Sequence, residues 1–273
     1  MVLRDLGSFT TAHQVIIEIG GLPVGVRTDS AEFFNILENR YSGFVNAEAQ
    51  PLFEFNVEIV PPGKVTEEDE PNVRFENGRW VLERGDFHAE WSPAAGTGMI
   101  RQSALPYAID SAMRIVHSLL LADRGGLLLH AASVVRNGRA YLFAGVSGAG
   151  KTTISRLAPP DATLLSDEIS YVTRTGEGYT AFGTPFAGEL AKPGENVSAP
   201  VAAVYLLAKG NENTIEPVSK ADAVRGVLES VLFFAKDPEL VGHVFASACE
   251  LVREVPVQRL TFAPDSRVWE MVR

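Results

Sequence analysis

The sequence predicts an α/β protein in two parts, a smaller β-rich domain over residues 1–103 and a mixed-sheet domain over residues 104–273. Three patterns predict this fold. Apolar and polar residues alternate through much of residues 13–100, which is the period of half-buried strands. A glycine-rich strand-to-helix turn occupies residues 145–152, and an Asn-Gly pair at 137–138 joins the strands before it into an antiparallel hairpin. A hairpin leading into such a turn indicates a mixed sheet rather than a parallel one.

The composition indicates a folded chain without nucleic-acid or membrane partners. Its 273 residues suggest about two domains, because domains average ~150 residues. Hydrophobic residues make up 46%, which is enough for a sizeable core. The net charge of −10 repels nucleic acid. The sequence has no run of ~18 apolar residues, so no membrane span is expected.

The cysteine content favours a cytoplasmic location. Cys249 is the single cysteine, so no internal disulfide can form, which suits a reducing compartment. Residues 1–5 also lack the charged-then-apolar layout of a signal peptide.

The first part of the chain is expected to form strands around one helix. Ser30 is a helix cap before residues 31–41, where apolar side chains recur at helical spacing. Asn77-Gly78 is the strongest kind of short hairpin signal. Strands are expected at residues 15–19, 23–27, 52–60, 73–76, 79–84, 87–91 and 98–103.

The second part is expected to alternate helices and strands. Residues 106–121 place apolar side chains on one side of a helix. A short helix follows Lys151 and stops before Pro159-Pro160, because proline breaks a helix interior. Further strands are expected at residues 127–136, 139–144, 163–165, 169–174, 179–182, 201–208 and 257–262, and further helices at residues 221–235, 238–253 and the C-terminal end.

The turn at residues 145–152 reads GVSGAGKT and matches G-x-x-x-x-G-K-[ST] in full. Glycines let backbone N–H groups curl around phosphate oxygens, and the following helix presents its positive end to the same anion. Lys151 would reach the β- and γ-phosphates, and the Thr152 hydroxyl would face Mg²⁺. A glycine-rich turn without a ligand is the alternative, and the flanking strand and helix favour the phosphate site. The expected nucleotide-binding residues are Gly145, Ser147, Gly148, Ala149, Gly150, Lys151, Thr152 and Thr153.

Competing motifs fail at single positions. A hydrolase nucleophile elbow needs glycine where Ala149 stands. A dinucleotide fingerprint counted from Gly148 needs glycine at Thr153. The sequence also lacks the Asn-Lys-x-Asp motif of guanine-binding GTPases, although the choice between adenine and guanine otherwise stays open.

An acidic pair follows the next apolar strand. Asp167 stands where a P-loop protein holds the second side of its Mg²⁺, and Glu168 is the neighbouring candidate.

A histidine is placed by register: if Arg136 pairs with Arg139 across the hairpin, His130 lies opposite Gly145, at the mouth of the turn. Each residue also has a simpler explanation, as an exposed strand-end acid or a hydrogen-bonded core histidine.

The turn-rich segment 182–189 has two interpretations. It is either a loop beside the nucleotide, with Glu189 and Lys192 as polar contacts, or a plain surface crossover, which is the favoured alternative.

These residues resemble the HPr kinase and phosphoenolpyruvate carboxykinase superfamily, over roughly residues 127–210. Residues 145–155 are similar to the carboxykinase loop G-L-S-G-T-G-K-T-T-L-S, and Ser166-Asp167-Glu168 is similar to its D-D-E triplet with the first acid replaced. His130 stands 15 residues before Gly145, as the equivalent histidine does in HPr kinases. The resemblance implies a mixed-sheet P-loop kinase core of this type.

The resemblance also implies an ATP- and Mg²⁺-dependent phosphotransferase that uses ATP or another nucleoside triphosphate. A γ-phosphoryl group would pass to a hydroxyl of an unidentified protein, peptide or small molecule. Thr152 and Asp167 would hold the metal, and His130, Asp167 and Glu168 would be catalytic. The β-rich domain would recognise the acceptor or a partner protein, and a homo-oligomer would be in keeping with HPr kinases.

Two departures limit this resemblance. Ser166 replaces one acid of the pair that activates the acceptor, so the general base is either Asp167 or Glu168. The later signature loop of HPr kinases is missing, and the chain is far shorter than a carboxykinase, so neither HPr nor oxaloacetate is implied as substrate. The alternative function is a catalytically silent nucleotide-binding sensor or assembly protein. An acidic group within hydrogen-bond reach of an acceptor would separate the two.

Overall fold

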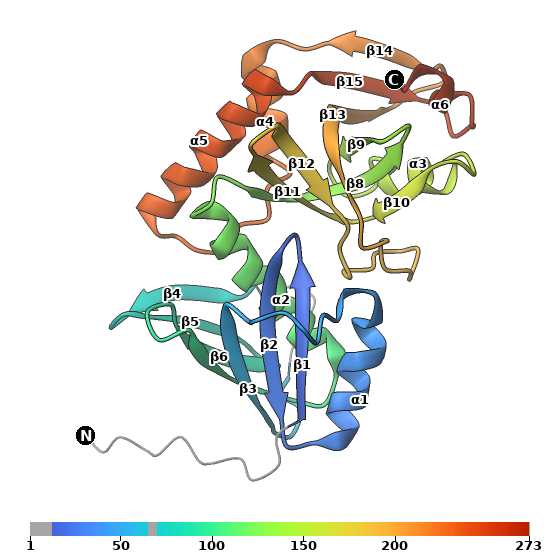
Figure 1. The fold of residues 1–273 in the computed structure, drawn as a ribbon. Coiled ribbons are helices and arrows are strands. Elements are labelled where there is room, and N and C mark those ends of the chain that lie inside the picture. Colours follow the sequence, from blue (N-terminus) through green and yellow to red (C-terminus); the bar gives the residue numbers. More distant parts are fainter. Residues whose placement is uncertain (1–12, 65–69, 273) are drawn as a thin grey trace. The chain divides into compact units, whose positions relative to one another are not determined.

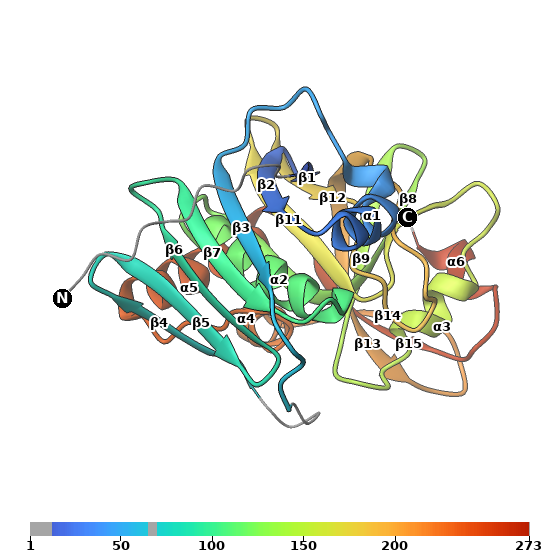
Figure 2. The ribbon, with the colours of Figure 1, turned by 90° about the horizontal axis from the view of Figure 1, so that it is seen from below.

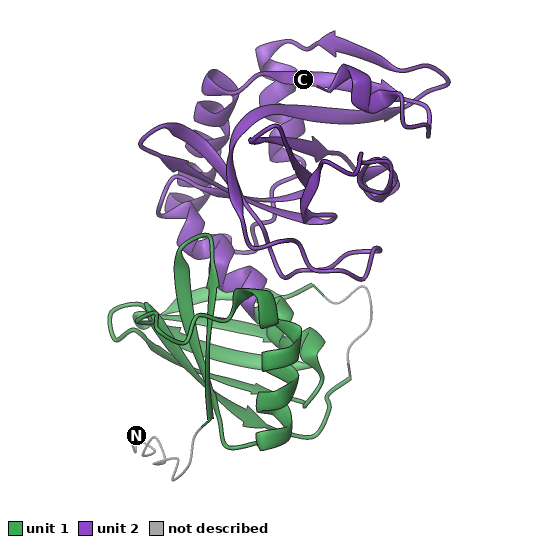
Figure 3. Cartoon of the chain, turned by 45° about the vertical axis from the view of Figure 1, so that its right-hand side comes forward, with its two compact units in different colours: residues 1–112 green, residues 113–273 purple. Residues whose placement is uncertain are grey.

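A computed structural model describes residues 13–64 and 70–272 of the chain. The chain divides into two compact units, residues 1–112 and residues 113–273 (Figure 3). This division falls inside helix α2 (Pro106–Ala122), later than the boundary expected after residue 103. The chain is α/β, as predicted, and each unit holds a mixed sheet; a mixed sheet was predicted for the second part, and a β-rich domain for the first. The expectation about the first five residues lies outside the described residues.

Unit 1 is a seven-stranded sheet with helix α1 (Ala31–Arg40) against β1 and β2 (Figure 2). Ser30 caps α1 by accepting the backbone N–H of Phe33, as predicted. The crossover through α1 makes β3 parallel to β2, and β3 is also parallel to β7, whereas all other neighbours are antiparallel. The elements are β1 (His13–Ile19), β2 (Leu22–Thr28), the 3-10 turn η1 (Ser42–Phe44), β3 (Phe53–Ile59), β4 (Asn72–Glu76), β5 (Arg79–Arg84), β6 (Phe87–Ser92) and β7 (Thr97–Gln102).

Unit 2 holds eight strands and most of the helices (Figure 1). Its remaining elements are β8 (Leu127–Arg136), β9 (Arg139–Ala144), α3 (Lys151–Arg156), β10 (Thr163–Ser166), β11 (Ile169–Thr175), β12 (Gly178–Phe182), β13 (Ser198–Lys209), β14 (Thr214–Pro217), α4 (Lys220–Leu228), α5 (Pro238–Glu254), β15 (Val257–Phe262) and α6 (Val268–Met271). Within the described part of the chain, none of the helices has the length and apolarity needed to cross a membrane.

Two long strands of unit 2 are shared between neighbouring parts of its sheet. The first half of β8 pairs with β11 and the second half with β9. The start of β13 pairs with β12, and its middle is parallel to β9. These pairings close a ring of strands in the order β8, β11, β12, β13 and β9. The C-terminal end of β9 therefore lies beside β8 and β13, and this is where the glycine-rich turn begins.

The predicted hairpin register is confirmed. Asn137 and Gly138 both have positive φ, 52° and 72°, which matches the right-handed twist of the flanking strands. Arg136 pairs with Arg139, and the ladder continues without a shift to the pair of Ala131 and Ala144. The next residues along the two strands are His130 and Gly145.

Two elements of unit 2 differ from the prediction. The helix expected over residues 221–235 ends at Leu228, because the following apolar residues bond to the edge of β8 instead. Val231 bridges to Leu129, and the Leu232 N–H donates to the Leu128 carbonyl at 2.8 Å. Strand β14 was not predicted, since its four residues are too few to show a period.

The segment from Gly183 to Val197, the 183–197 loop, runs along β10. Backbone N–H groups of Thr184 and Glu195 donate to the carbonyls of Leu165 and Leu164 at 3.0 and 2.9 Å. Gly194 is needed for this approach, because a Cβ there would lie 1.7 Å from the Leu165 carbonyl oxygen. The loop is therefore fixed to the strand that carries the acidic pair.

We expect Gly194→Ala to lower the free energy of unfolding by about 1–3 kcal/mol, the usual cost of forcing atoms into a packed site. Gly176→Ala is the matched control: nothing lies within 4 Å of its added Cβ, so its stability should change by less than ~0.5 kcal/mol. Urea unfolding followed by circular dichroism measures both. Equal stability of the two variants would contradict the packing of the loop on β10.

A buried histidine on α2 predicts a pH dependence of stability. His117 is fully buried, and burial lowers its pKa from 6.5 to about 4. The folded state therefore disfavours protonation: stability is complete above pH 6.5 and decreases as the pH falls towards 4, by at most about 3 kcal/mol. We expect His117→Leu to flatten the unfolding free energy over this window. Urea unfolding between pH 4 and 7 compares this variant with the parent chain, and equal slopes of the two would contradict the expectation.

Candidate functional site

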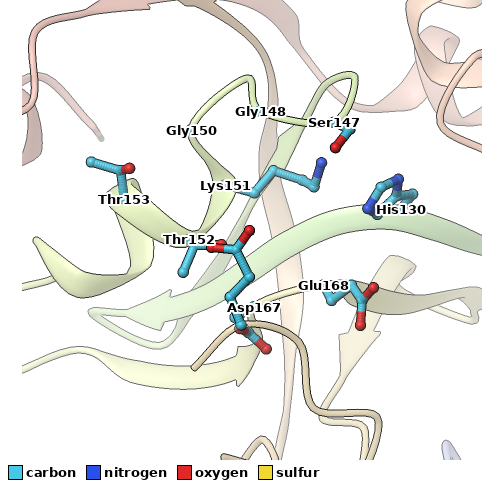
Figure 4. A pocket seen from close by; sticks show the side chains of 10 residues that line it. His130, Ser147, Gly148, Gly150, Lys151, Thr152, Thr153, Asp167 and Glu168 are labelled. Atoms are coloured by element: carbon cyan, nitrogen blue, oxygen red, sulfur yellow. The ribbon is translucent and has the colours of Figure 1, made fainter. Parts of the chain in front are cut away.

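A cavity of about 260 Å³ lies in unit 2 at the turn between β9 and α3 (Figure 4). Residues from four segments far apart in the sequence line it. All the predicted site residues except Gly145 and Ala149 are among them. The lining residues are His130, Ser147, Gly148, Gly150, Lys151, Thr152, Thr153, Asp167, Glu168 and Glu189.

Residues 145–150, the glycine loop, have a backbone that suits glycine at several points. Gly148 and Gly150 have φ of 75° and 109°, which other residues rarely adopt. A Cβ at Gly150 would also lie 2.7 Å from the Phe262 ring. Gly145 and Ala149 do not line the cavity but pack together, since a Cβ at Gly145 would lie 2.8 Å from that of Ala149. These two residues therefore support the shape of the loop through their packing, away from the cavity surface.

Lys151 is the cation of the cavity. It is only 7% exposed, and its Nζ donates to the carbonyls of Gly145 and Val146 at 2.9 and 3.2 Å. Burial lowers the pKa of Lys151, and the negative charges of Glu168 and Glu189 oppose this effect. The loop carbonyls therefore hold the ammonium group at the mouth of the glycine loop, directed towards His130 and Ser147 in Figure 4.

Asp167 joins the end of β10 to the 183–197 loop. Its side chain is buried, and Oδ1 accepts the Gly188 N–H at 2.9 Å while Oδ2 accepts the Leu190 N–H at 2.8 Å. A Cβ at Gly188 would lie 2.9 Å from Asp167 Oδ2, so only glycine permits this approach. The two bonds bracket Glu189 and present it to the cavity.

Ser166 shapes the turn that carries the two acids. Its buried hydroxyl accepts the N–H groups of Glu168 and Ile169 at 3.2 and 2.8 Å. This local bonding is typical of serine at a turn. The Ser166 hydroxyl thus bonds to the backbone, and the cavity receives its carboxylates from Asp167, Glu168 and Glu189.

Glu168 and His130 have altered acidities. Burial raises the pKa of Glu168, and nearby Asp167 also raises it, whereas Arg114 opposes the shift. Burial lowers the pKa of His130, and the positive charges of Lys151 and Arg114 lower it further. These effects favour the neutral form of His130, in which one ring nitrogen is a donor and the other an acceptor.

Two residues near the acids were missed or undervalued. Arg114, on α2, lies with its Nη2 3.6 Å from Glu168 Oε2. The sequence signal for it was a charged residue within a mostly apolar helix, but only the fold reveals its partner. For segment 182–189, a plain surface crossover was favoured over a loop beside the nucleotide with Glu189 as a polar contact. Glu189 of the 183–197 loop in fact lines the cavity.

A preformed metal cage is not present in the described residues, where no group of three or more His, Cys, Asp or Glu side chains could hold an ion. Mg²⁺ does not need such a cage, because it commonly uses one or two carboxylates together with waters and phosphate oxygens. The Asp167 carboxylate and the Thr152 hydroxyl, both at the cavity, are oxygen ligands of the kind it prefers.

The fold and the site together define an α/β protein with two mixed sheets and a cavity built on a glycine loop. Residues 101–273 match the family described as ScmC, SynChlorMet cassette protein. Because this match covers more than half of the chain, the chain belongs to the ScmC family. The matched region includes every residue that lines the cavity. No curated protein gives a significant match.

The bonds of Asp167 predict a local effect of Asp167→Asn. The amide has one acceptor oxygen, so its NH₂ group must face one of the two N–H donors. Loss of a hydrogen bond to a charged group costs about 1.5–3 kcal/mol, so the amide of Gly188 or Leu190 should exchange with solvent about 10–100-fold faster. Hydrogen exchange measures this directly. Asp161→Asn, at an exposed carboxylate, should leave both rates unchanged.

Proposed function

We propose that this chain binds a nucleoside triphosphate with Mg²⁺ in the cavity and transfers the γ-phosphoryl group to a hydroxyl acceptor. One observation carries the proposal: the buried Lys151 at the glycine loop shares a single cavity with Asp167, Glu168 and His130. The hairpin that leads into the loop within a mixed sheet supports the resemblance to the HPr kinase and phosphoenolpyruvate carboxykinase superfamily.

The cavity suits the phosphates rather than a whole nucleotide. Its volume of about 260 Å³ lies just below the usual range for small-molecule pockets, about 300–1,000 Å³. The glycine loop and Lys151 would bind the β- and γ-phosphates, and the ribose and base would extend beyond the cavity. ATP is the natural first probe, and any nucleoside triphosphate shares this phosphate chemistry.

The charges at the cavity favour a divalent cation with the nucleotide. Asp167, Glu168 and Glu189 supply three carboxylates against the single ammonium of Lys151. A bare triphosphate would be repelled by this excess of negative charge. Asp167 and the Thr152 hydroxyl would hold Mg²⁺, which neutralises phosphate charge when bound.

Glu168 is the better of the two candidate bases. Both oxygens of Asp167 accept backbone N–H groups, whereas the Glu168 carboxylate lines the cavity with a raised pKa, which makes it the stronger proton acceptor. The bond from the γ-phosphorus to the bridging oxygen breaks, and a bond to the acceptor oxygen forms. The acceptor proton passes to Glu168, and the nucleoside diphosphate leaves. Neutral His130 would donate a hydrogen bond to the transferred group.

The test combines MgATP binding by calorimetry with slow hydrolysis, in which water replaces the acceptor. Lys151→Ala should weaken binding at least about tenfold, the effect of a lost charged hydrogen bond. Glu168→Gln should keep the binding and lower turnover about 100-fold, the contribution of a general base. Lys220→Ala, at an exposed lysine of α4, is the control and should match the parent chain.

Three results would decide otherwise. Equal turnover of Glu168→Gln and the parent chain would remove Glu168 as the base. Binding without turnover, even with hydroxyl acceptors added, would favour the nucleotide sensor. A parent chain that does not bind MgATP would overturn the proposal as a whole.

A further inference from the structure

Arg114 connects three segments next to the cavity without lining it. Its Nη2 lies 3.6 Å from Glu168 Oε2, on the turn after β10. Its guanidinium lies over the Phe186 ring of the 183–197 loop, 5.2 Å from the ring centre. The side chain is 26% exposed, and its Nε is fully buried. A planar guanidinium that stacks on a ring while facing a carboxylate is held in one orientation.

Glu168 has two cations within electrostatic range. Its charge acts on Lys151 as well as on Arg114. Lys151 nevertheless bonds to the carbonyls of Gly145 and Val146, and the Glu168 carboxylate lies apart from the ammonium group in Figure 4. A flexible glutamate without a second partner would be drawn to the buried ammonium, since opposite charges attract strongly where water is excluded.

We infer that Arg114 is a positioning residue that holds the Glu168 carboxylate away from Lys151. The inference rests on the proposed function. In that function the separation leaves Lys151 available for phosphate and Glu168 available for the acceptor hydroxyl. Phe186 fixes the guanidinium from the other side, so the 183–197 loop takes part in this separation.

The inference predicts a suppressor effect in MgATP binding. Arg114→Gln should weaken binding about tenfold, because Glu168 then pairs with Lys151 and competes with phosphate. Adding Glu168→Gln to that variant should restore the affinity to that of Glu168→Gln alone, since the competing charge is gone. A loss caused by general damage to the fold would not be restored. Arg114→Lys, which keeps the charge, should bind within about threefold of the parent chain.

Arg136→Gln is the matched control. Arg136 has the same 26% side-chain exposure and also pairs with a carboxylate, Asp161 at 3.1 Å, but this carboxylate, unlike that of Glu168, does not line the cavity. Its affinity for MgATP should equal that of the parent chain. Thermal unfolding of every variant reports any loss of fold separately.

The inference is overturned if Arg114→Gln binds MgATP like the parent chain, or if the double variant stays as weak as Arg114→Gln. In both cases the parent chain binds MgATP, so these results leave the proposed nucleotide binding untouched. Failure of the proposed function looks different: the folded parent chain itself does not bind MgATP, and the inference falls with it.

Discussion

The site depends on one interaction, in which the Asp167 carboxylate accepts two backbone N–H groups of the 183–197 loop. We call this pair of hydrogen bonds the clasp. A strand end and a loop some twenty residues later meet at two hydrogen bonds of 2.9 and 2.8 Å. The meeting requires Gly188, whose missing Cβ leaves room for the carboxylate. Glu189 and Phe186 reach their places through this contact. Without it, Glu189 would lose the bonds on either side that direct it to the cavity.

The charged groups of the site are kept apart rather than paired with one another. Lys151 is held by backbone carbonyls, Asp167 by backbone N–H groups and Glu168 by Arg114. The partner that restrains each of these three side chains is thus never another charged side chain of the cavity. Direct pairs among them would be stronger in isolation, but they would consume the charges that a triphosphate and its acceptor would need in the proposed function. This preorganisation is the kind that phosphoryl transfer uses.

A feature of the fold or the site could be predicted when the residues that determine it lie close together in the sequence. The Asn137-Gly138 turn dictates the register of β8 and β9, so the position of His130 beside the glycine loop followed from counting residues. The glycine loop and the acids after β10 carry their own sequence signals. The partnership of Arg114 with Glu168 has none, because it joins a helix to a turn more than fifty residues away. The early end of α4 at Leu228 likewise depends on a bond to β8 that no helical period reveals.

Asp167 has two tasks in the proposed mechanism, and its chemistry allows both. A carboxylate offers about four lone-pair positions, and the Gly188 and Leu190 N–H groups use two of them. A metal can therefore bind the remaining positions while the clasp persists. Metal binding and loop position would then both act on the Asp167 side chain. A cation bound to the carboxylate would weaken its hydrogen bonds to the loop. Conversely, these hydrogen bonds would orient the free lone pairs towards the cavity. In the proposed function, this one carboxylate would therefore link nucleotide binding to the placement of Glu189.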